Sequence, residues 1–453
     1  MKKSSFLSKM LRFGRIFAIS IIITTCVNFL SLNAQLQLPE DFVAQQEKER
    51  VKEYANYFGE DIYHFRNRMM DDSATMDAES ISHALQDMER QVAKKTAVVY
   101  IKSLPKQLEI LVVTSRDKSI RKSISAANQY SFRKTVKHFT SEISKAPSQI
   151  KSTSYLASAL QLYQWIVAPI EKDLKAQNID TLLFCVGSEL RSAALSALYD
   201  GKQFLVEKYS LAITHAFSLN RRGYHYVDIR KKKVLAMGSS QFEDLGPLPG
   251  VPLELSMITQ SKGGEVFLNN KFTVDNLKAQ RRSEAFQIVH LATHAVFRPK
   301  SISNSYIQFW NKKLPLNQLR QLQLDKPPIE LLVLSSCTTA VGNKESELGF
   351  SGLAVAAGVK TVLGSFWDVS DLATLAFMTQ YYKHLRTAPV KADAVRQAKI
   401  EMLKGQIQIK DGQLRGSALR TGMQLPSELS ESGYIDLSHP YYWAPFTTIG
   451  SPW

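Results

Sequence analysis

A histidine and a cysteine each follow a short apolar run that is typical of a buried strand. His294 comes after the run at residues 288–292, and Cys337 comes after the run at 331–334. Parallel strands of an open α/β sheet present their carboxyl ends at the same edge. The separation of 43 positions (337 minus 294) leaves room for one crossover and a short hairpin. An imidazole beside a thiol can remove its proton and later protonate a leaving group, so the pattern predicts a cysteine nucleophile with a histidine base.

The chain from residue 96 onward alternates apolar runs with helical patterns. The runs lie at 97–101, 108–113, 181–185, 234–237, 288–292, 331–334 and 361–366, and the helices at about 126–145, 154–175, 252–261, 315–322 and 350–357. Apolar runs without period-two alternation indicate strands buried on both faces, and helices between them make the strands parallel. We therefore predict an α/β fold with one mostly parallel sheet and helices on both faces. The last run, 441–449, contains Pro445, which favours an edge strand.

Three parts of different composition follow one another along the chain. Residues 1–34 form a leader, and residues 35–95 are polar with apolar positions at helical spacing, which predicts two or three short helices. Such a segment could bind a protein partner. The α/β domain then spans 96–453, and turn signals at 220–223 divide it into halves of about 96–220 and 221–453.

The leader has a basic head, an apolar run at 16–32 and a small-residue end at 32–34. This order is typical of a secretory signal peptide that is cleaved before Gln35. The alternative is an uncleaved membrane anchor, because a helix spans a bilayer with roughly 17–25 apolar residues. In both cases the basic end stays inside, so we expect the domain to be exported to the periplasm or the extracellular space, or to be held there by a single membrane span.

Charge and cysteine content narrow the class of protein. The net charge is +16, and about +11 remains without the five basic residues of the leader, which favours anionic partners. The densest basic cluster comprises Arg221, Arg222 and the run at 230–233 and has no nucleic-acid-binding motif beside it, so no nucleic acid partner is expected. Three cysteines, one of them in the leader, exclude a disulfide scaffold, and Cys185 is expected as a small buried residue. Cysteine and histidine are too sparse for a structural zinc site, and no phosphate-binding loop or dinucleotide fingerprint occurs, so we expect no metal and no cofactor.

Two sequence strings around the paired residues resemble motifs of a known family. The string HLATHA at 290–295 and the string LLVLSSCTTA at 331–340 look like the histidine and cysteine motifs of the CHAT domain family, whose members are caspase-like and related to separase. Further similar positions are the Pro-Leu-Pro at 247–249 with Glu254, the glycine-rich stretch at 352–358, the string GSFW at 364–367 and the string HPYYWAPF at 439–446. The resemblance covers about residues 96–453.

The resemblance implies a cysteine endopeptidase of caspase-like type that hydrolyses protein or peptide substrates. His294 and Cys337 match the family's catalytic dyad, and the backbone amides of Ala295 and Cys337 would hold the oxyanion of the intermediate. His290 also lies in the motif, but its position within the strand favours a structural role.

One position departs from the family pattern. Residue 295 is usually glycine in the family and is alanine here. If the position needs a positive φ, alanine costs roughly 1–2 kcal/mol. This departure keeps open an alternative function, in which the domain is an interaction module with a caspase-like shape and lapsed catalysis.

Two acids near the end of the run at 361–366 could select the substrate. Asp368 or Asp371 could line the pocket for the residue before the scissile bond and favour arginine or lysine. The alternative makes Asp371 part of a helix cap and Asp368 a loop residue.

Overall fold

The structure of the chain is a computed structural model. It describes residues 39–57, 76–116, 118–147, 153–219, 226–296, 298, 304–335, 358–417, 419–430 and 433–453. The predicted leader at 1–34, Cys337, the turn at 220–223 and the predicted helix at 350–357 lie outside these residues. Among the helices that the structure describes, none is both long enough and apolar enough to span a bilayer.

A single large sheet of eleven strands runs through the described part of the chain. Its strands lie in the order β3-β2-β1-β4-β5-β18-β13-β12-β8-β6-β7. Their bounds are β1 Thr96–Ser103, β2 Leu108–Val113, β3 Ile120–Ile124, β4 Thr181–Cys185, β5 Ser210–Thr214, β6 Val234–Gly238, β7 Gly264–Leu268, β8 Ile288–Ala292, β12 Leu331–Leu334, β13 Thr361–Ser365 and β18 Phe446–Gly450. Seven of the ten neighbouring pairs are parallel, which confirms the predicted mostly parallel sheet.

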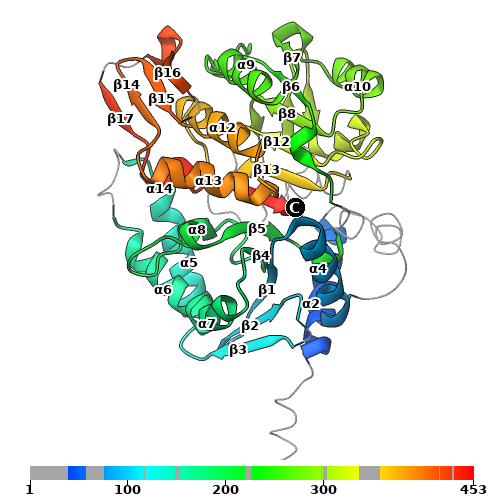
Figure 1. Cartoon of the computed structure of the whole chain (residues 1–453), viewed down its shortest axis with the longest axis vertical. Helices are drawn as coiled ribbons and strands as arrows, with labels where there is room; N and C mark the ends of the chain where they lie inside the picture. The colour runs from blue at the N-terminus through cyan, green and yellow to red at the C-terminus, as the bar shows by residue number, and fades with distance from the viewer. Residues whose placement is uncertain are drawn as a thin grey trace, which may run out of the picture.

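The last strand, β18, joins two halves of this sheet. It pairs in parallel with β5 and antiparallel with β13. The parallel strands β1, β4 and β5 of the first half therefore run opposite to β13, β12, β8 and β6 of the second half. Because ligands bind beyond the carboxyl ends of parallel strands, the two halves offer such ends at opposite edges of one sheet. Figure 1 shows the two halves as a lower and an upper lobe.

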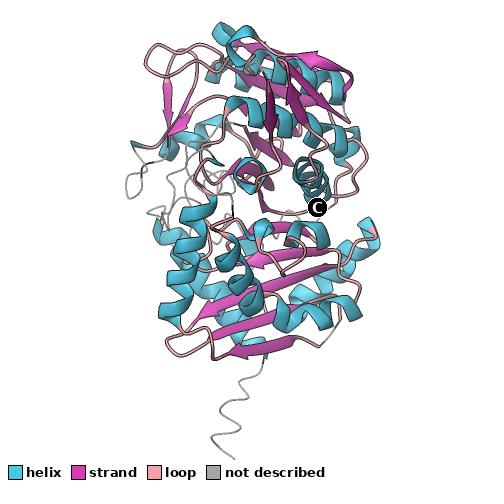
Figure 2. Cartoon of the chain, turned by 90° about the vertical axis from the view of Figure 1, so that its left-hand side faces the viewer, coloured by secondary structure: helices cyan, strands magenta, loops and turns pink. Residues whose placement is uncertain are grey.

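Helices cover both faces of the sheet, as predicted (Figure 2). They are α2 Pro39–Tyr57, α4 Ala78–Val92, α5 Gln129–Ile143, α6 Leu156–Ile166, α7 Ala168–Ala176, α8 Leu205–Lys208, α9 Val251–Lys262, α10 Val274–Ser283, α12 Asp371–Leu385, α13 Lys391–Leu403 and α14 Pro440–Trp443, with 3₁₀ turns at Leu195–Ala197, Ile229–Lys231, Asn269–Lys271, Leu316–Leu322 and Ser427–Leu429. In β8, Ile288 and Ala292 contribute to the apolar core on one face, whereas Val289 and Leu291 contribute to the core on the other. Both faces of the strand are thus buried, which is why its sequence shows no alternation.

The two described helices of the segment at 35–95 pack on the large sheet. Helix α4 directs Ile81, Leu85 and Met88 into a core shared with Val98 of β1 and Leu183 of β4. Helix α2 packs beside it (Figure 1). The two helices therefore complete one face of the first half of the sheet.

The prediction of an edge strand at 441–449 was wrong. Residues 440–443 form α14, and the strand begins at Phe446, so Pro445 lies just before it. The strand needs no hydrogen bond from Pro445, and β18 can lie in the centre of the sheet between β5 and β13.

Two small sheets accompany the large one in the second half. Strands β9 Ala295–Val296, β10 Tyr306–Gln308 and β11 Lys313–Pro315 form the first, and β14 Gln408–Lys410, β15 Gln413–Gly416, β16 Leu419–Gln424 and β17 Tyr434–Asp436 form the second. Neither sheet was predicted, because most positions of these strands for which burial is described are partly or fully exposed, so no apolar run marks them in the sequence.

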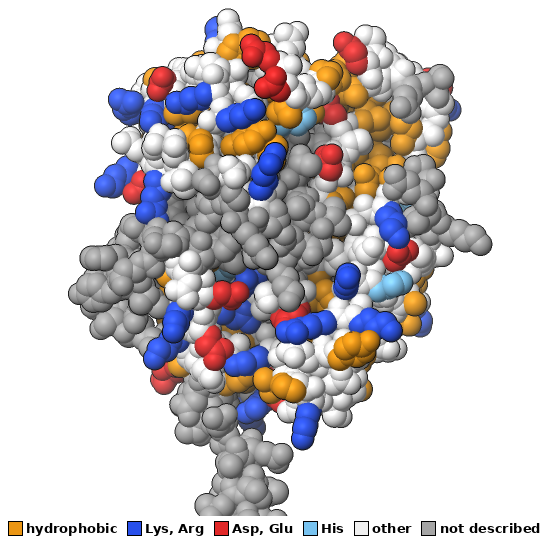
Figure 3. All heavy atoms as spheres, turned by 180° about the vertical axis from the view of Figure 1, so that it is seen from behind, with side chains coloured by type: hydrophobic (Ala, Val, Ile, Leu, Met, Phe, Trp, Pro, Cys, Tyr) orange, Lys and Arg blue, Asp and Glu red, His pale blue; other side chains and the backbone are white. Residues whose placement is uncertain are grey.

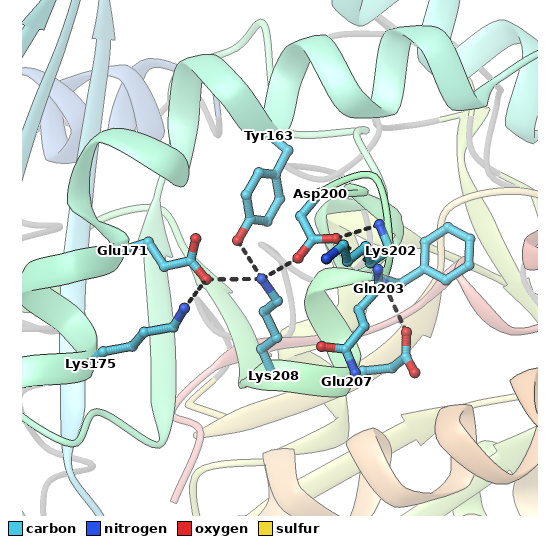
Figure 4. A network of polar contacts seen from close by, with 9 residues as sticks. Tyr163, Glu171, Lys175, Asp200, Lys202, Gln203, Glu207 and Lys208 are labelled. Carbon is cyan, nitrogen blue, oxygen red and sulfur yellow. Dashed lines mark hydrogen bonds and ion pairs between the residues drawn. The ribbon is translucent and has the colours of Figure 1, made fainter.

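A polar network around Lys208 ties together three helices of the first half (Figure 4). The ammonium of Lys208 donates hydrogen bonds to Tyr163 of α6 and Glu171 of α7, both at 2.9 Å, and forms an ion pair with Asp200. Partial burial lowers the pKa of Lys208, but its hydrogen bonds to Asp200, Tyr163 and Glu171 outweigh that effect and raise the pKa above its usual range. The network is a structural joint between α6, α7 and α8.

Candidate active site

The register of β8 and β12 brings together the strand ends that precede His294 and Cys337. The strands are parallel, with Leu291 opposite Leu334. The amide of Ser335 then donates to the carbonyl oxygen of Leu291 at 3.2 Å, so the pairing continues past the end of β12. Each candidate residue follows its paired leucine by three positions in the sequence. His294 is described and partly exposed at this edge, whereas Cys337 lies outside the described residues.

The imidazole of His294 is held by a backbone carbonyl. Its Nε2 lies 2.7 Å from the carbonyl oxygen of Gly246. A carbonyl oxygen can only accept, so Nε2 carries the hydrogen, and in the neutral ring Nδ1 is the nitrogen with an available lone pair. The ring of Phe242 packs against the imidazole edge-to-face at 4.6 Å between centroids. These two contacts define both the tautomer and the orientation that a general base requires.

The loop that carries Gly246 is itself fixed at two points. It connects β6 to α9, and the amide of Leu248 donates to the carbonyl of Ser240 at 3.0 Å. At its end, the amide of Gly250 donates to a carboxylate oxygen of Asp371 at 2.6 Å. A side chain at position 250 would lie within 3.0 Å of that carboxyl group, so glycine is needed for the close approach.

Asp371 is therefore engaged with the loop, while Ser370 caps helix α12. The hydroxyl of Ser370 accepts from the amide of Ala373. Burial raises the pKa of the Asp371 carboxyl to about 6, against the lowering effect of its hydrogen bond from Gly250. The nearby carboxylate of Glu254 adds to the increase. The predicted role of Asp371 in a substrate pocket stays a prediction.

A second histidine lies beneath the candidate site and is fully buried. His290, in the middle of β8, places Nε2 at 2.9 Å from a carboxylate oxygen of Glu254 in α9. Its Nδ1 lies 3.1 Å from the hydroxyl of Tyr382 in α12. His290 thus links the sheet to two helices, as its position within the strand predicted. Glu254 lies four residues after Gly250, so this link also anchors the start of α9.

Alanine fits the backbone at position 295 without strain. Ala295 begins β9 in an extended conformation, and its φ lies outside the left-handed region. The amide of Gln308 donates to the carbonyl of His294 at 2.9 Å, and Ile307 lies opposite Ala295. Because hydrogen-bonded and non-hydrogen-bonded pairs alternate in an antiparallel ladder, the amide of Ala295 points away from β10. The predicted oxyanion role of this amide stays a prediction, but the strain expected for alanine is absent.

Asp368 lies at the same edge as His294. It follows β13, the neighbour of β12, and is exposed. Partial burial of its carboxyl raises the pKa of Asp368, and the electrostatic interaction with His294 lowers it. The carbonyl of Asp368 accepts from the hydroxyl of Tyr441 at 3.2 Å, and Trp367 donates to the carbonyl of Tyr441 at 3.0 Å. The backbone that carries Asp368 is thereby fixed.

The cysteine that the structure describes, Cys185, lies away from the candidate site. Cys185 is fully buried at the end of β4 in the first half, as predicted, and its thiol contacts the carbonyl of His215 at 3.2 Å. Within the described ranges, no group of three or more histidine, cysteine, aspartate or glutamate side chains is arranged to hold a metal ion.

Comparison with known sequences identifies the domain. The sequence model of the CHAT domain family matches residues 156–451, which is well over half of the chain. The chain belongs to the CHAT domain family. The match includes β8, β12 and β13, the three strands whose ends surround His294 and Asp368. No curated protein matches the chain by sequence.

Solved structures similar to this CHAT domain are distant in sequence. A chain of the Saccharomyces cerevisiae separase–securin complex is 11% identical, with a TM-score of 0.49 over 86% of this chain and 33% of that one. A chain of the complex of Porphyromonas gingivalis RgpB pro- and mature domains is 10% identical, with a TM-score of 0.38 over 72% of this chain and 76% of that one. The CHAT chain thus spans about a third of the length of the separase-complex chain.

The sequence did not predict how the CHAT domain holds its histidine. Pro247, Pro249 and Glu254 were noted as family-like positions, without a role. The sequence signal for a fixed loop at these positions was the pair of prolines before a helix, which is typical of a rigid turn. The acceptor for His294 is a backbone oxygen, however, and no residue type marks a backbone oxygen in a sequence.

Proposed function

We propose that this CHAT domain is a cysteine endopeptidase that hydrolyses protein substrates through His294 and Cys337. The contact between Nε2 of His294 and Gly246 carries the proposal, because it leaves Nδ1 as the base at the edge where β12 ends. An imidazole whose only role is structural would not need a partly exposed position with one nitrogen directed away from its partner.

The proposed reaction proceeds through a thioester. His294 takes the thiol proton of Cys337, and the thiolate attacks the carbonyl carbon of the scissile peptide bond. The amides of Ala295 and Cys337 stabilise the oxyanion of the tetrahedral intermediate. The imidazolium of His294 then protonates the leaving amine, and a water molecule, deprotonated by His294, hydrolyses the thioester and restores the thiol.

Asp368 is the better candidate of the two predicted specificity residues. Its side chain is exposed beside His294, whereas the carboxylate of Asp371 accepts the amide of Gly250. We expect Asp368 to favour lysine or arginine before the scissile bond, because a carboxylate binds these cations in a charge-assisted contact.

The alternative of a lapsed interaction module loses its main support. It was motivated by Ala295 and by the helical segment at 35–95, and Ala295 is extended and unstrained. Protein partners other than substrates remain a proposal. The apolar side chains of α4 pack on the sheet, so such a partner would have to bind the outward faces of the 35–95 segment. Export by the leader is proposed on the pattern of residues 1–34 alone.

A peptide library tests the proposed activity. The full chain is incubated with peptides that vary at the position before the cleaved bond, and the products are identified by mass spectrometry. We expect cleavage after lysine or arginine, none by the Cys337→Ala variant, and a loss of the basic preference in Asp368→Asn. Cleavage that persists in Cys337→Ala, or its absence in the wild type across the library, would contradict the proposal.

A further inference from the structure

In the first half of the sheet, the parallel strands have their carboxyl ends at the edge opposite to His294. Strands β1, β4 and β5 end there, and helix α2 lies over them. Figure 1 shows α2 beside the lower lobe, next to α4. This is the place where an open α/β sheet normally binds a ligand.

A buried glutamate of α2 binds two consecutive amides at this edge. The carboxylate of Glu47 accepts from the amides of Phe217 and Ser218, both at 2.9 Å, just beyond β5. It also accepts the hydroxyl hydrogen of Tyr100 in β1 at 2.7 Å. Glu47 is 2% exposed. These three donors form a specific binding site for one carboxylate.

Two further charges of α2 have matched partners. The guanidinium of Arg50 donates to the carbonyl of Ile101 at 3.1 Å and to that of Val186. Glu53 receives a two-pronged hydrogen bond from Arg191, whose side chain is 2% exposed, and the contact to Nη1 measures 2.8 Å. We call the set of Tyr100, Ile101, Val186, Arg191, Phe217 and Ser218 the α2-binding surface.

The spacing of the three charges explains why one helix fits the surface. Glu47, Arg50 and Glu53 are three residues apart, so they lie along one side of the helix. Lys48 and Lys52 lie on the other side and are exposed, whereas the exposed Glu49 pairs with Lys102 of β1 at 3.1 Å. Val43, Val51, Tyr54 and Ala55 of α2 are also buried, so apolar packing and charge-assisted hydrogen bonds together hold this helix, whereas α4 is held by its apolar stripe.

The surface favours an occupant of one chemical kind. With α2 in place, Arg191 and Ser218 are buried, and Glu47 and Glu53 accept from Arg191 and from the amides of Phe217 and Ser218. A helix without acids at these positions would cover the same donors and leave these hydrogen bonds unmade, which is costly. Burial is also the main cause that holds the pKa of His215 well below its usual value, with Arg191 and Arg50 next, so this neighbour stays uncharged. The surface is thus a set of donors and acceptors preorganised for an acid–base–acid pattern.

We propose that the α2-binding surface is a docking site for a helix with glutamate, arginine and glutamate at three-residue intervals, and that α2 occupies it in cis. A helix with this pattern on a partner protein competes with α2 for the same surface. The site is separate from the candidate peptidase site, since the two lie at opposite edges of the sheet.

A labelled peptide with the sequence of residues 39–57 tests the proposal by fluorescence polarisation. The target is the full chain with Glu47→Gln and Glu53→Gln, which weaken its own α2. We expect this variant to bind the peptide about tenfold or more tightly than the wild type, because the wild-type α2 competes from within the same chain. Adding Arg191→Gln to the variant should reduce binding by about tenfold, since it removes the guanidinium that receives Glu53.

The controls separate docking from general opening. Lys52→Gln, on the exposed side of α2, should bind the peptide no better than the wild type, and a peptide with Glu47 and Glu53 replaced by glutamine should not bind the weakened variant. If the double variant fails to fold, Glu53→Gln alone serves, because the side chain of Glu53 is 44% exposed. Equal binding by the wild type and the folded weakened variant, or binding unaffected by Arg191→Gln, would overturn the proposal.

Discussion

The two halves of the sheet use the same kind of edge in different ways. In the first half, the carboxyl ends of β1, β4 and β5 are covered by α2, and buried charges such as Glu47 and Arg191 are paired there. In the second half, β8 ends in a partly exposed imidazole with an exposed carboxylate beside it. The comparison teaches that this architecture offers two ligand edges, one of which is filled by the chain itself.

The distribution of charged side chains on the surface supports this difference between the two edges. Lysine and arginine side chains are scattered over the described part of the face in Figure 3, with acids between them. The basic cluster at 230–233 is partly balanced, because Arg230 pairs with Asp228 and Lys233 pairs with Glu284. Basic side chains on this face are thus dispersed among acids, and the paired charges near the strand ends are the more specific feature.

The largest expected effect comes from His294→Ala in the second half. We expect peptide hydrolysis to fall by about 10²- to 10⁴-fold, the usual contribution of a general base, while the free energy of unfolding changes by about 1 kcal/mol or less. Turnover assays and urea denaturation measure the two quantities. If His294→Ala unfolds at a much lower urea concentration than the wild type but loses little turnover, His294 has a structural role and the assignment of this edge as the active site is wrong.

Glu47→Ala in the first half should do the opposite. Each buried donor left without its acceptor costs about 1–3 kcal/mol, so we expect a clear loss of stability. The Glu47→Ala variant should retain turnover, because Glu47 lies at the edge of the sheet opposite to His294. Urea denaturation monitors the loss, with the exposed Lys52→Ala of the same helix as the control. An unchanged midpoint would show that α2 adds nothing to the stability of the sheet.

Asp371→Asn provides a smaller, pH-dependent effect. The pKa of Asp371 is raised to about 6 in the fold, so between its unfolded value near 4 and pH 6 the native state binds more protons than the unfolded state. The group therefore lowers stability as pH rises through this window. Asparagine can still accept from Gly250 without a charge, so we expect the variant to gain stability over the wild type at pH 7 relative to pH 4.

Urea midpoints at the two pH values give this difference. The exposed Asp275→Asn, in the first turn of α10, is the control and should show no such gain. A gain that is larger at pH 4 would mean that the carboxylate of Asp371 is stabilised by its surroundings.

Ala295→Gly should have the smallest effect. Because Ala295 is extended, glycine relieves no strain and costs about 0.5–1 kcal/mol of stability in a strand. We expect turnover to stay within about twofold of the wild type. A large gain in turnover would indicate that the active backbone at this position differs from the observed one, and would revive the lapsed-module alternative.

The sequence predicted the parts of the molecule that depend on local pattern. The runs at 288–292 and 331–334 lack alternation because both faces of β8 and β12 are buried, and this physical cause made the parallel sheet predictable. The buried role of His290 followed from its position within such a run.

Contacts between distant residues could not be predicted in the same way. Glu53 and Arg191 are 138 positions apart, and charged residues of this kind are normally solvated, so nothing in the sequence marked them as a pair. Pro445 was misjudged because its effect depends on where the strand begins, which is set by the packing of α14. The tie between His294 and Gly246 depends on a backbone oxygen, which has no sequence signal.

The rate at which Cys337 reacts with iodoacetamide, followed from pH 5 to pH 9, tests most directly whether His294 activates it. A cysteine without an activating partner ionises near pH 8.5, whereas an imidazole partner lowers that value. We predict rapid alkylation of Cys337 well below pH 7.5 in the wild type and a shift of the profile toward about pH 8.5 in His294→Ala. Identical profiles for the two proteins would contradict the account.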